Sequence, residues 1–218
     1  MQKSELRTWL LKCEYRIASM TTFILIRHGM TDAVGHTMTG HTAGVHLNAA
    51  GRDQAASLPA RLGHVPIAAI YSSPLERARE TAQPIADAQG LRIDIEPRFI
   101  EVDFGGWTNR RFADLAGDRH WQLYNAFRGV TRPPAGEALV DVQTRTVAAL
   151  LDLHARHPDD VVAVVSHADT LRAMLLYFLG MPIDFVQRLD LSPARLSVLQ
   201  VGESAPRVLQ VNADTYVA

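Results

Sequence analysis

Two continuous apolar runs, at 23–26 and 161–165, stand out in the pattern of hydrophobic and polar positions. Runs of β-branched and aromatic residues without alternation predict strands that are buried on both faces, as in the middle of a parallel sheet. Shorter runs and helical spacings fill the rest of the chain. The pattern predicts strands over 23–26, 67–71, 91–96, 161–165, 195–201 and 206–212, and helices over 48–62, 75–88, 137–156 and 169–180, with two weaker helical patterns between 110 and 128.

Turn and cap residues separate these elements. Asn48 is expected to be the N-cap of its helix, and Ser73 is expected to cap a helix that Pro74 opens. The stretch 35–46 is rich in Gly, His and Thr and is too polar and irregular for a core element. A Pro-rich stretch at 132–136 predicts a rigid loop before the longest helix.

Strands that alternate with helices indicate an α/β fold. We predict a three-layer α/β/α sandwich with a mostly parallel, mixed central sheet that ends in an antiparallel pair at 195–212. One domain is expected over 21–218, because no repeat or linker divides it. Residues 1–20 form an N-terminal extension, read either as an extra helix or as sequence upstream of a natural start at Met20.

Composition narrows the class of protein. The 218 residues carry 22 basic and 23 acidic side chains, a net charge of −1, and 47% are hydrophobic. Without a basic block we expect no nucleic-acid partner and no membrane surface as partner. No apolar stretch is long enough for a membrane span, and the first twenty residues lack a signal-peptide core. A single cysteine, Cys13, fits a reducing, cytoplasmic location.

Ionisable side chains follow three of the predicted strands. Arg27 and His28 follow the first, Arg77 lies one helical turn beyond the second, and His167 follows the run at 161–165. Because the carboxyl ends of parallel strands share one edge of the sheet, these groups are expected to converge. Helices that begin near Pro74 and 168 would direct backbone N–H groups to the same place, which favours an anion.

Glu101 is the candidate acid of this group. It lies in an apolar and aromatic stretch, Phe99 to Trp107, and such surroundings raise the pKa of a carboxyl group. Taken alone, an Arg-His pair or a lone glutamate is more often an ordinary surface feature. Two arginines, two histidines and one partly buried carboxylic acid together suit phosphoryl transfer.

The chain resembles the histidine phosphatase superfamily, which includes the cofactor-dependent phosphoglycerate mutases. The motifs that carry this resemblance are Arg27-His28-Gly29, the stretch 72–82, Glu101 with 103–105, and 165–167, in the order and context that the family shows. The resemblance covers 21–200. It implies a histidine phosphatase domain with a mixed sheet flanked by helices.

By matching residue to motif, the resemblance also implies roles. His28 would be the nucleophile and Glu101 the proton donor, and Arg27, Arg77 and His167, the last protonated, would hold the phosphoryl oxygens. The substrate-binding set is expected to be Arg27, Thr31, Gly40, Arg77, His167 and Ala168. No metal or other cofactor is expected, because the arginines neutralise the charge.

The function expected from this set is a metal-independent phosphomonoester hydrolase that acts through a phosphohistidine on a small phosphorylated metabolite. One rival is a phosphoglycerate mutase, which needs a closing insert and further cations; the stretch 107–132 is short for that purpose. The other rival is a non-catalytic protein that binds a phosphorylated ligand. The sequence is compatible with a homodimer and does not decide the oligomeric state.

Several further residues allow two readings. Thr31 offers a hydroxyl to the pocket or caps a turn. Arg110 and Arg111 would grip a second anionic group or lie on a solvated helix face, the reading we favour. His36, His41 and His46 lack the spacing of a metal site and read as surface residues. Trp121 and Tyr124 read as core or as the roof of a leaving-group pocket. Asp103, Phe104 and Trp107 are expected to shape the wall near Glu101.

Overall fold

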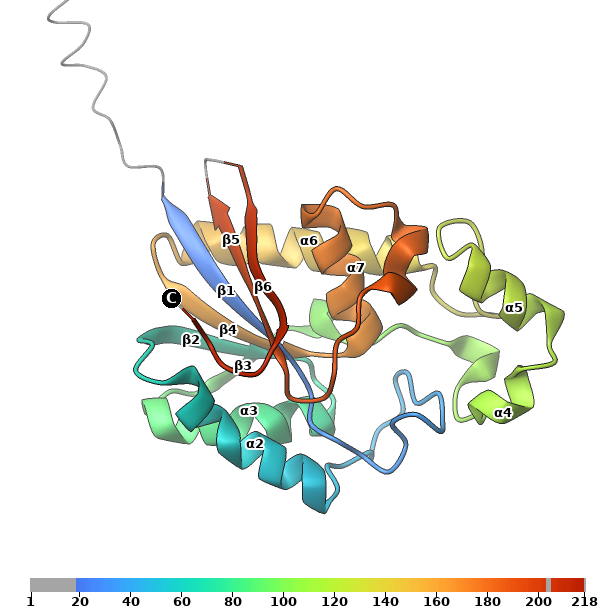
Figure 1. Ribbon diagram of the computed structural model, residues 1–218, viewed down its shortest axis with the longest axis horizontal. Coiled ribbons are helices and arrows are strands. Elements are labelled where there is room, and N and C mark those ends of the chain that lie inside the picture. The colour runs from blue at the N-terminus through green and yellow to red at the C-terminus, as the bar shows by residue number, and fades with distance from the viewer. Residues whose placement is uncertain (1–18, 203–204, 218) are drawn as a thin grey trace, which may run out of the picture.

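The computed structural model describes residues 19–202 and 205–217 and shows one mixed sheet between two layers of helices (Figure 1). The strands are β1 (Met20–Arg27), β2 (Ile67–Ser72), β3 (Ile93–Ile95), β4 (Val161–Ser166), β5 (Leu196–Gly202) and β6 (Arg207–Ala213). Their order is β3-β2-β4-β1-β5-β6. The first four run parallel, and β5 and β6 complete the sheet as an antiparallel pair, which confirms the predicted fold class.

The helices cover both faces of this sheet and one end of it. In Figure 1, α6 and α7 lie on one face, α2 and α3 lie on the other, and α4 and α5 stand beyond one end. Their bounds are α2 (Ala49–Leu62), α3 (Glu76–Gln89), α4 (Phe112–Leu115), α5 (Arg119–Ala126), α6 (Leu139–Arg156) and α7 (Ala168–Phe178), with short 3₁₀ helices at Pro97–Phe99, Gly105–Trp107 and Ile183–Arg188.

The unbroken apolar run of β1 serves two cores. Phe23 and Leu25 point toward α6 and α7, where they pack with Leu150 and Met174. Ile24 and Ile26 belong to the opposite core, formed with α2 and α3. Successive side chains of a strand point to opposite faces, so a strand covered on both sides must be apolar at every position. This is the physical reason for the three layers.

Most elements lie where the sequence places them. Apart from β1, which begins at Met20, the four main helices and the strands end within two residues of their predicted bounds, and the stretch 110–128 holds two short helices. Asn48 is the N-cap of α2, where its side chain accepts a hydrogen bond from the backbone N–H of Gly51 at 2.9 Å. The predicted extra helix within 1–20 lies outside the described residues except for 19 and 20.

The cap predicted for α3 is wrong. The helix begins at Glu76, and its N-cap is Leu75, which provides no side-chain bond. The Ser73 hydroxyl accepts a hydrogen bond from the Leu75 N–H at 3.3 Å, but it also bonds the ring of His167 at 2.7 Å. Ser73 therefore lies before the helix, directly after β2, and its hydroxyl bonds the ring of His167, which follows β4.

The segment 105–136 forms a cap that carries α4 and α5. Its two ends lie side by side in a narrow neck, where the Gly106 N–H donates to Pro134 O at 2.7 Å and the Glu137 N–H donates to Asp103 O at 2.8 Å. A Cβ on Gly105, whose φ is +48°, would lie 2.2 Å from Pro134 O. Glycine is required at this point because the two backbones approach so closely.

The cap packs on the sheet domain through a core of its own. Trp107, Leu115 and Tyr124 of the cap are buried against residues of α6 and α7 such as Leu139 and Leu176. The ring of Trp107 meets the rings of Trp121 and Tyr124 edge to face, with centroids 5.3 and 5.2 Å apart. Tyr124 is thus a core residue, as one of its two readings predicts.

Candidate active site

Three neighbouring strands end at the same level and deliver the predicted site residues. In the parallel register Arg27 pairs with Ser166, and Ser72 pairs with Val165. The chain continues this alignment past the strands, because the His28 N–H donates to Ser166 O at 2.9 Å and the Ser73 N–H donates to Val165 O at 2.9 Å. Residues far apart in sequence therefore meet at one edge of the sheet, as expected.

His28 lies at the centre of this edge with one ring nitrogen available. Its side chain is buried, and its Nδ1 bonds the carbonyl oxygen of Gly29 at 2.8 Å. A carbonyl only accepts, so Nδ1 carries the proton and Nε2 of the neutral ring keeps its lone pair. Burial, reinforced by Arg27 and Arg77, lowers the pKa of His28 to about 3. The ring is therefore neutral at physiological pH and suited to nucleophilic attack.

Three buried nitrogens around this edge lack hydrogen-bond partners among the described residues: Arg27 Nε, Arg77 Nε and His167 Nδ1. Each of the two guanidinium groups is held through another of its nitrogens. Arg27 Nη1 donates to Leu191 O at 2.5 Å, and Arg77 Nη2 donates to Gly40 O at 2.8 Å. Unpaired buried polar groups are costly, and such a group calls for an explanation, such as a ligand.

His167 is fully buried at this edge of the sheet. Its ring lies 5.2 Å from the ring of His28 between centroids. Burial lowers its pKa well below the usual value, and the charge of Arg77 adds to this effect. These surroundings favour the neutral ring while no anion is bound, and protonation of His167 in the presence of a phosphoryl group stays a prediction. The Ser73 hydroxyl at Nε2 leaves Nδ1 as the free nitrogen.

Glu101 is buried and held on one oxygen. Its Oε1 accepts hydrogen bonds from the N–H of Val102 at 3.0 Å and from the N–H and hydroxyl of Thr170 at 3.2 and 2.9 Å. Burial raises the pKa of this carboxyl group, and the negative charge of Asp169 raises it further. The protonated form is thereby favoured, as a proton donor requires.

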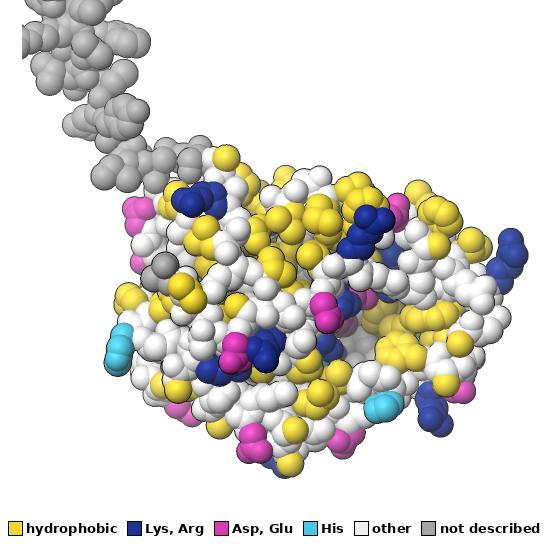
Figure 2. Space-filling view, viewed as in Figure 1, with side chains coloured by type: hydrophobic (Ala, Val, Ile, Leu, Met, Phe, Trp, Pro, Cys, Tyr) yellow, Lys and Arg dark blue, Asp and Glu magenta, His cyan; other side chains and the backbone are white. Residues whose placement is uncertain are grey.

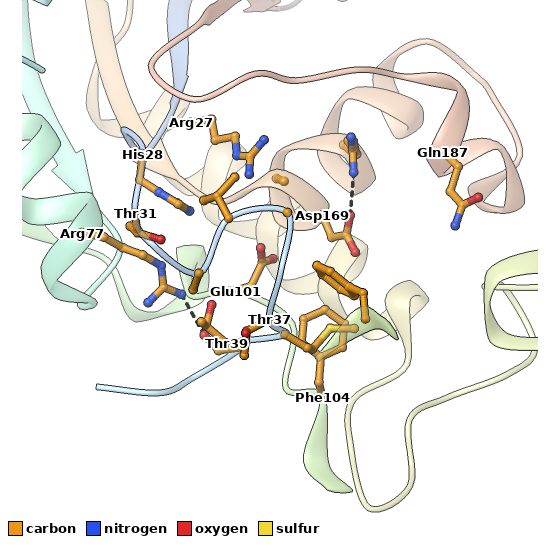
Figure 3. A pocket seen from close by; sticks show the side chains of 18 of the residues that line it. Arg27, His28, Thr31, Thr37, Thr39, Arg77, Glu101, Phe104, Asp169 and Gln187 are labelled. Atoms are coloured by element: carbon orange, nitrogen blue, oxygen red, sulfur yellow. Dashed lines mark hydrogen bonds and ion pairs between the residues drawn. The ribbon is translucent and has the colours of Figure 1, made fainter. Parts of the chain in front are cut away.

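The remaining predicted binding residues also lie at this pocket. Thr31, Gly40 and Ala168 line a cavity of about 400 Å³ together with Arg27, His28, Arg77 and Glu101. Thr31 lines the cavity, and its backbone carbonyl accepts a hydrogen bond from the Val34 N–H in a turn. Figure 3 shows Arg27, His28, Thr31, Arg77 and Glu101 around one end of this cavity.

The other end of the cavity is formed largely by the cap. Its wall comprises Phe104, Phe112, Trp121, Asn125, Arg128, Asp169, Arg172 and Gln187. In the space-filling view the molecule is hollowed next to α4 and α5, and hydrophobic side chains gather on that side (Figure 2). Trp121 therefore lines the cavity, and its role in a leaving-group pocket stays a prediction. Arg110 and Arg111 are exposed and do not line the cavity, in keeping with the solvated reading.

Several residues of the site escape the sequence reading. Arg128, Asp169 and Arg172 line the cavity as an ion-pair cluster. The exposed His41 also has a role, because its Nε2 bonds the carbonyl oxygen of Glu101 at 2.7 Å. The spacing of Asp169 and Arg172 on one helix face signals a local pair, but no local pattern connects Arg128 or His41 with these partners.

The site offers no obvious place for a metal. Over residues 19–202 and 205–217, no group of three or more His, Cys, Asp or Glu side chains is placed to hold a metal ion. Within the same ranges, no helix combines the length and apolar character that crossing a membrane requires.

The structure is an α/β protein in which two arginines and two histidines meet where three parallel strands end. Residues 23–214 match the histidine phosphatase superfamily (branch 1), and the chain belongs to this family. A similar solved structure is the mycobacterial glucosyl-3-phosphoglycerate phosphatase Rv2419c, with a TM-score of 0.80, 27% identity, and coverage of 89% of this chain and 99% of that one. This likeness confirms the fold and the family resemblance.

Curated relatives carry several names. Phosphoserine phosphatase 1 of Hydrogenobacter thermophilus is 30% identical over 88% of this chain and 92% of its own length. A probable phosphoglycerate mutase GpmB of Yersinia enterocolitica is 31% identical over 85% of this chain and 87% of its own. The bifunctional protein Rv2228c of Mycobacterium tuberculosis is 32% identical over 90% of this chain, which spans only 55% of that relative's length.

Proposed function

We propose that this protein is a metal-independent phosphomonoester hydrolase that acts through a phosphohistidine on a small phosphorylated metabolite. One observation carries the proposal: three buried nitrogens without partners, on Arg27, Arg77 and His167, surround the strand-end edge where His28 holds a free Nε2. A phosphoryl group supplies oxygen acceptors for the two guanidinium N–H groups, and for Nδ1 of His167 once this nitrogen carries a proton. The guanidinium groups also supply the positive charge that a metal ion would otherwise bring.

In the first step the lone pair of His28 Nε2 attacks phosphorus. The N–P bond forms while the bond from phosphorus to the ester oxygen breaks in line with it. Glu101 gives its proton to the departing oxygen, which leaves as an alcohol. Arg27, Arg77 and His167 hold the other three oxygens, where the negative charge of the transition state is spread.

In the second step water attacks the phosphohistidine. The carboxylate of Glu101 takes a proton from the water, the N–P bond breaks, and inorganic phosphate leaves. Glu101 is then protonated and His28 neutral, so the site is ready for another cycle. The first step starts from protonated Glu101 and neutral His28. The raised pKa of Glu101 and the low pKa of His28 favour these two forms.

The size of the cavity and the names of the relatives support a small substrate. The cavity of about 400 Å³ lies in the range of small-molecule sites. Relatives named phosphoserine phosphatase 1 and glucosyl-3-phosphoglycerate phosphatase carry names of small phosphorylated molecules. Two amide side chains, Asn125 and Gln187, and the aromatic wall give the leaving-group end both polar and apolar contacts.

A mutase remains the rival enzyme, favoured by the relative named a probable phosphoglycerate mutase and by the further cations Arg128 and Arg172 in the cavity. The two activities separate in one assay. A hydrolase releases inorganic phosphate from 3-phosphoglycerate or other monoesters. A mutase converts 3-phosphoglycerate to 2-phosphoglycerate and depends on a bisphosphoglycerate primer.

The central experiment replaces His28 with alanine and measures hydrolysis of p-nitrophenyl phosphate in the presence of a chelator. We expect turnover to fall by about 10⁴-fold or more, since the nucleophile is lost. His64→Ala, at an exposed histidine away from the cavity, is the matched control and should keep full activity. Alkaline quenching should retain phosphate on the wild type and none on His28→Ala. Undiminished turnover by His28→Ala contradicts the proposal.

A further inference from the structure

Asp169 lies between two arginines at the boundary of the sheet domain and the cap. Its Oδ2 accepts a hydrogen bond from Arg128 Nη1 at 2.8 Å, and its Oδ1 accepts one from Arg172 Nη1 at 3.0 Å. Arg128 follows α5 in the cap, whereas Arg172 belongs to α7. The side chains of Arg128 and Asp169 are only 6% and 13% exposed. Both oxygens of this carboxylate are thus fixed in a largely dry environment.

The residue after Asp169 in α7 binds the side chain of the candidate acid, Glu101. Thr170, the residue after Asp169, donates its N–H and its hydroxyl to Oε1 of Glu101. Glu101 and Asp169 both line the cavity and point into it in Figure 3. They are the two carboxyl groups among the described residues that line it.

The other charged and titratable groups around Glu101 favour its ionised form or are neutral. Arg27 ends β1 and His28 follows it, Arg77 belongs to α3, and His167 is the N-cap residue of α7. At the backbone carbonyl of Glu101 lie His41 from the loop before α2 and Arg145 from α6, the latter at 3.1 Å. Among the groups that face the carboxyl, the ionised Asp169 is the negative one. Without it, the nearby arginines would draw the proton from Glu101.

We propose that Asp169 is a positioning residue for Glu101: its carboxylate, fixed by Arg128 and Arg172, keeps Glu101 protonated and joins the acid to the cap. The inference rests on the proposed role of Glu101 as the proton donor. The surroundings of one carboxyl group raise its pKa, and those of the other lower its pKa. Such a difference allows one carboxyl group to donate a proton while the other stays negatively charged. The two arginines lower the pKa of Asp169, so this group carries the charge while Glu101 carries the proton.

The decisive comparison uses charge changes of opposite sign. Asp169→Asn removes the negative charge beside Glu101, so Glu101 should lose its proton at lower pH. Arg128→Gln removes a positive charge from the same cluster, so Glu101 should keep its proton to higher pH. A purely structural role of the cluster would instead move both variants in the same direction, because both changes break the same buried pair.

The measurement is kcat/KM against pH with an alkyl phosphate, which needs a proton on the leaving oxygen, and with p-nitrophenyl phosphate, which needs it less. For Asp169→Asn and the alkyl phosphate, we expect kcat/KM on the alkaline side to fall by about fivefold or more. At the acidic optimum kcat/KM should fall by no more than about twofold. With p-nitrophenyl phosphate the fall in kcat/KM on the alkaline side should be smaller. Asp169→Glu, which keeps the charge, should restore the wild-type profile.

Two outcomes overturn this inference. One is an alkaline limb that does not move in Asp169→Asn; the other is a shift of both single variants to lower pH. Should Asp169→Asn fail to fold, ¹³C NMR of the Glu101 carboxyl in the wild type decides, because an ionised Glu101 at neutral pH contradicts the proposed effect. If His28→Ala retains activity, the proposed function fails instead, whatever the position of the limb.

Discussion

The two ends of the cavity are built in different ways. The phosphate end is fixed by the backbone of the sheet, through bonds such as His28 N–H to Ser166 O, and by Thr81, whose hydroxyl accepts from the Gly29 N–H at 2.9 Å. The end proposed for the leaving group is lined by side chains of the cap together with residues of α7 and of the 3₁₀ helix Ile183–Arg188. The cap meets α7 through packing and the pair between Arg128 and Asp169.

We expect the strand ends to determine the rate of the reaction and the cap to determine which substrates are accepted. Strand ends are held by the sheet, so the nucleophile and its cradle keep their geometry whatever the cap contains. The cap contributes no nucleophile and no unpaired nitrogen of the phosphate cradle. Changes at the phosphate end should therefore abolish turnover for every substrate, whereas changes in the cap should alter stability and the choice of leaving group.

The sharpest test of the phosphate end is Arg77→Gln. This change removes a charged donor from the transition state, so kcat/KM should fall by roughly 10²–10³-fold for every phosphomonoester. Steady-state kinetics with two chemically different substrates measures the effect. Arg79→Gln, two residues along the same helix and exposed, is the control and should leave kcat/KM unchanged. A loss confined to one substrate would place Arg77 at the leaving group instead.

The cap side is tested by Arg128→Leu. Breaking this buried pair leaves Asp169 with one arginine, and we expect the free energy of unfolding to fall by about 3 kcal/mol. Urea denaturation measures the change, and Arg132→Leu, at an exposed arginine, should cost less than about 0.5 kcal/mol. If both variants unfold at the same urea concentration, Arg128 does not anchor the cap.

The phosphate end should also make the fold sensitive to acid. The pKa of His28 is about 3 in the folded protein and near 6.5 when unfolded, so the unfolded state binds more protons in between. The stability of the neutral, buried ring is complete above pH 6.5 and is lost as the pH falls toward 3. Between pH 7 and pH 5 the wild type should lose about 2 kcal/mol more than His28→Asn. Equal losses in urea titrations would contradict this.

The smallest expected effect comes from Trp121→Ala in the wall of the cap. The ring lines the cavity and packs on Trp107. We expect KM to rise by roughly threefold to tenfold for substrates with a large leaving group and to change little for a small one, since apolar contact is lost only there. Leu123→Ala, at an exposed position on the same helix, controls for loosening of α5. An equal rise in KM for large and small leaving groups would contradict the assignment of this end of the cavity to the leaving group.

The fold and the phosphate end could be predicted because their signals are local. A strand buried on both faces must be apolar at each position, and this requirement is visible at 23–26 and 161–165. Parallel pairing then brings His28, Arg77 and His167 to one edge without further information. The family resemblance points to the same residues through short motifs.

The features of the site that could not be predicted depend on pairs of residues that are distant in sequence. Arg128 meets Asp169 across 41 residues, and His41 meets the carbonyl of Glu101 across 60, so no spacing rule connects them. The lowered pKa of His167 follows from its complete burial and from nearby cations, which a motif does not specify. Ser73 reads as a helix cap from its neighbours, although a ring from another strand end takes its hydroxyl.

The neck at Gly105 and Pro134 has a consequence for how such a protein changes over generations. Because the two ends of the 105–136 segment lie side by side, the length of this segment can change without changing the spacing of the strands. A replacement segment must still supply an apolar face for α6 and α7 and a partner for Asp169. Recombination at the neck would therefore exchange one wall of the cavity as a single piece, and the exchanges that keep these contacts are the ones expected to leave the strand ends and Glu101 undisturbed.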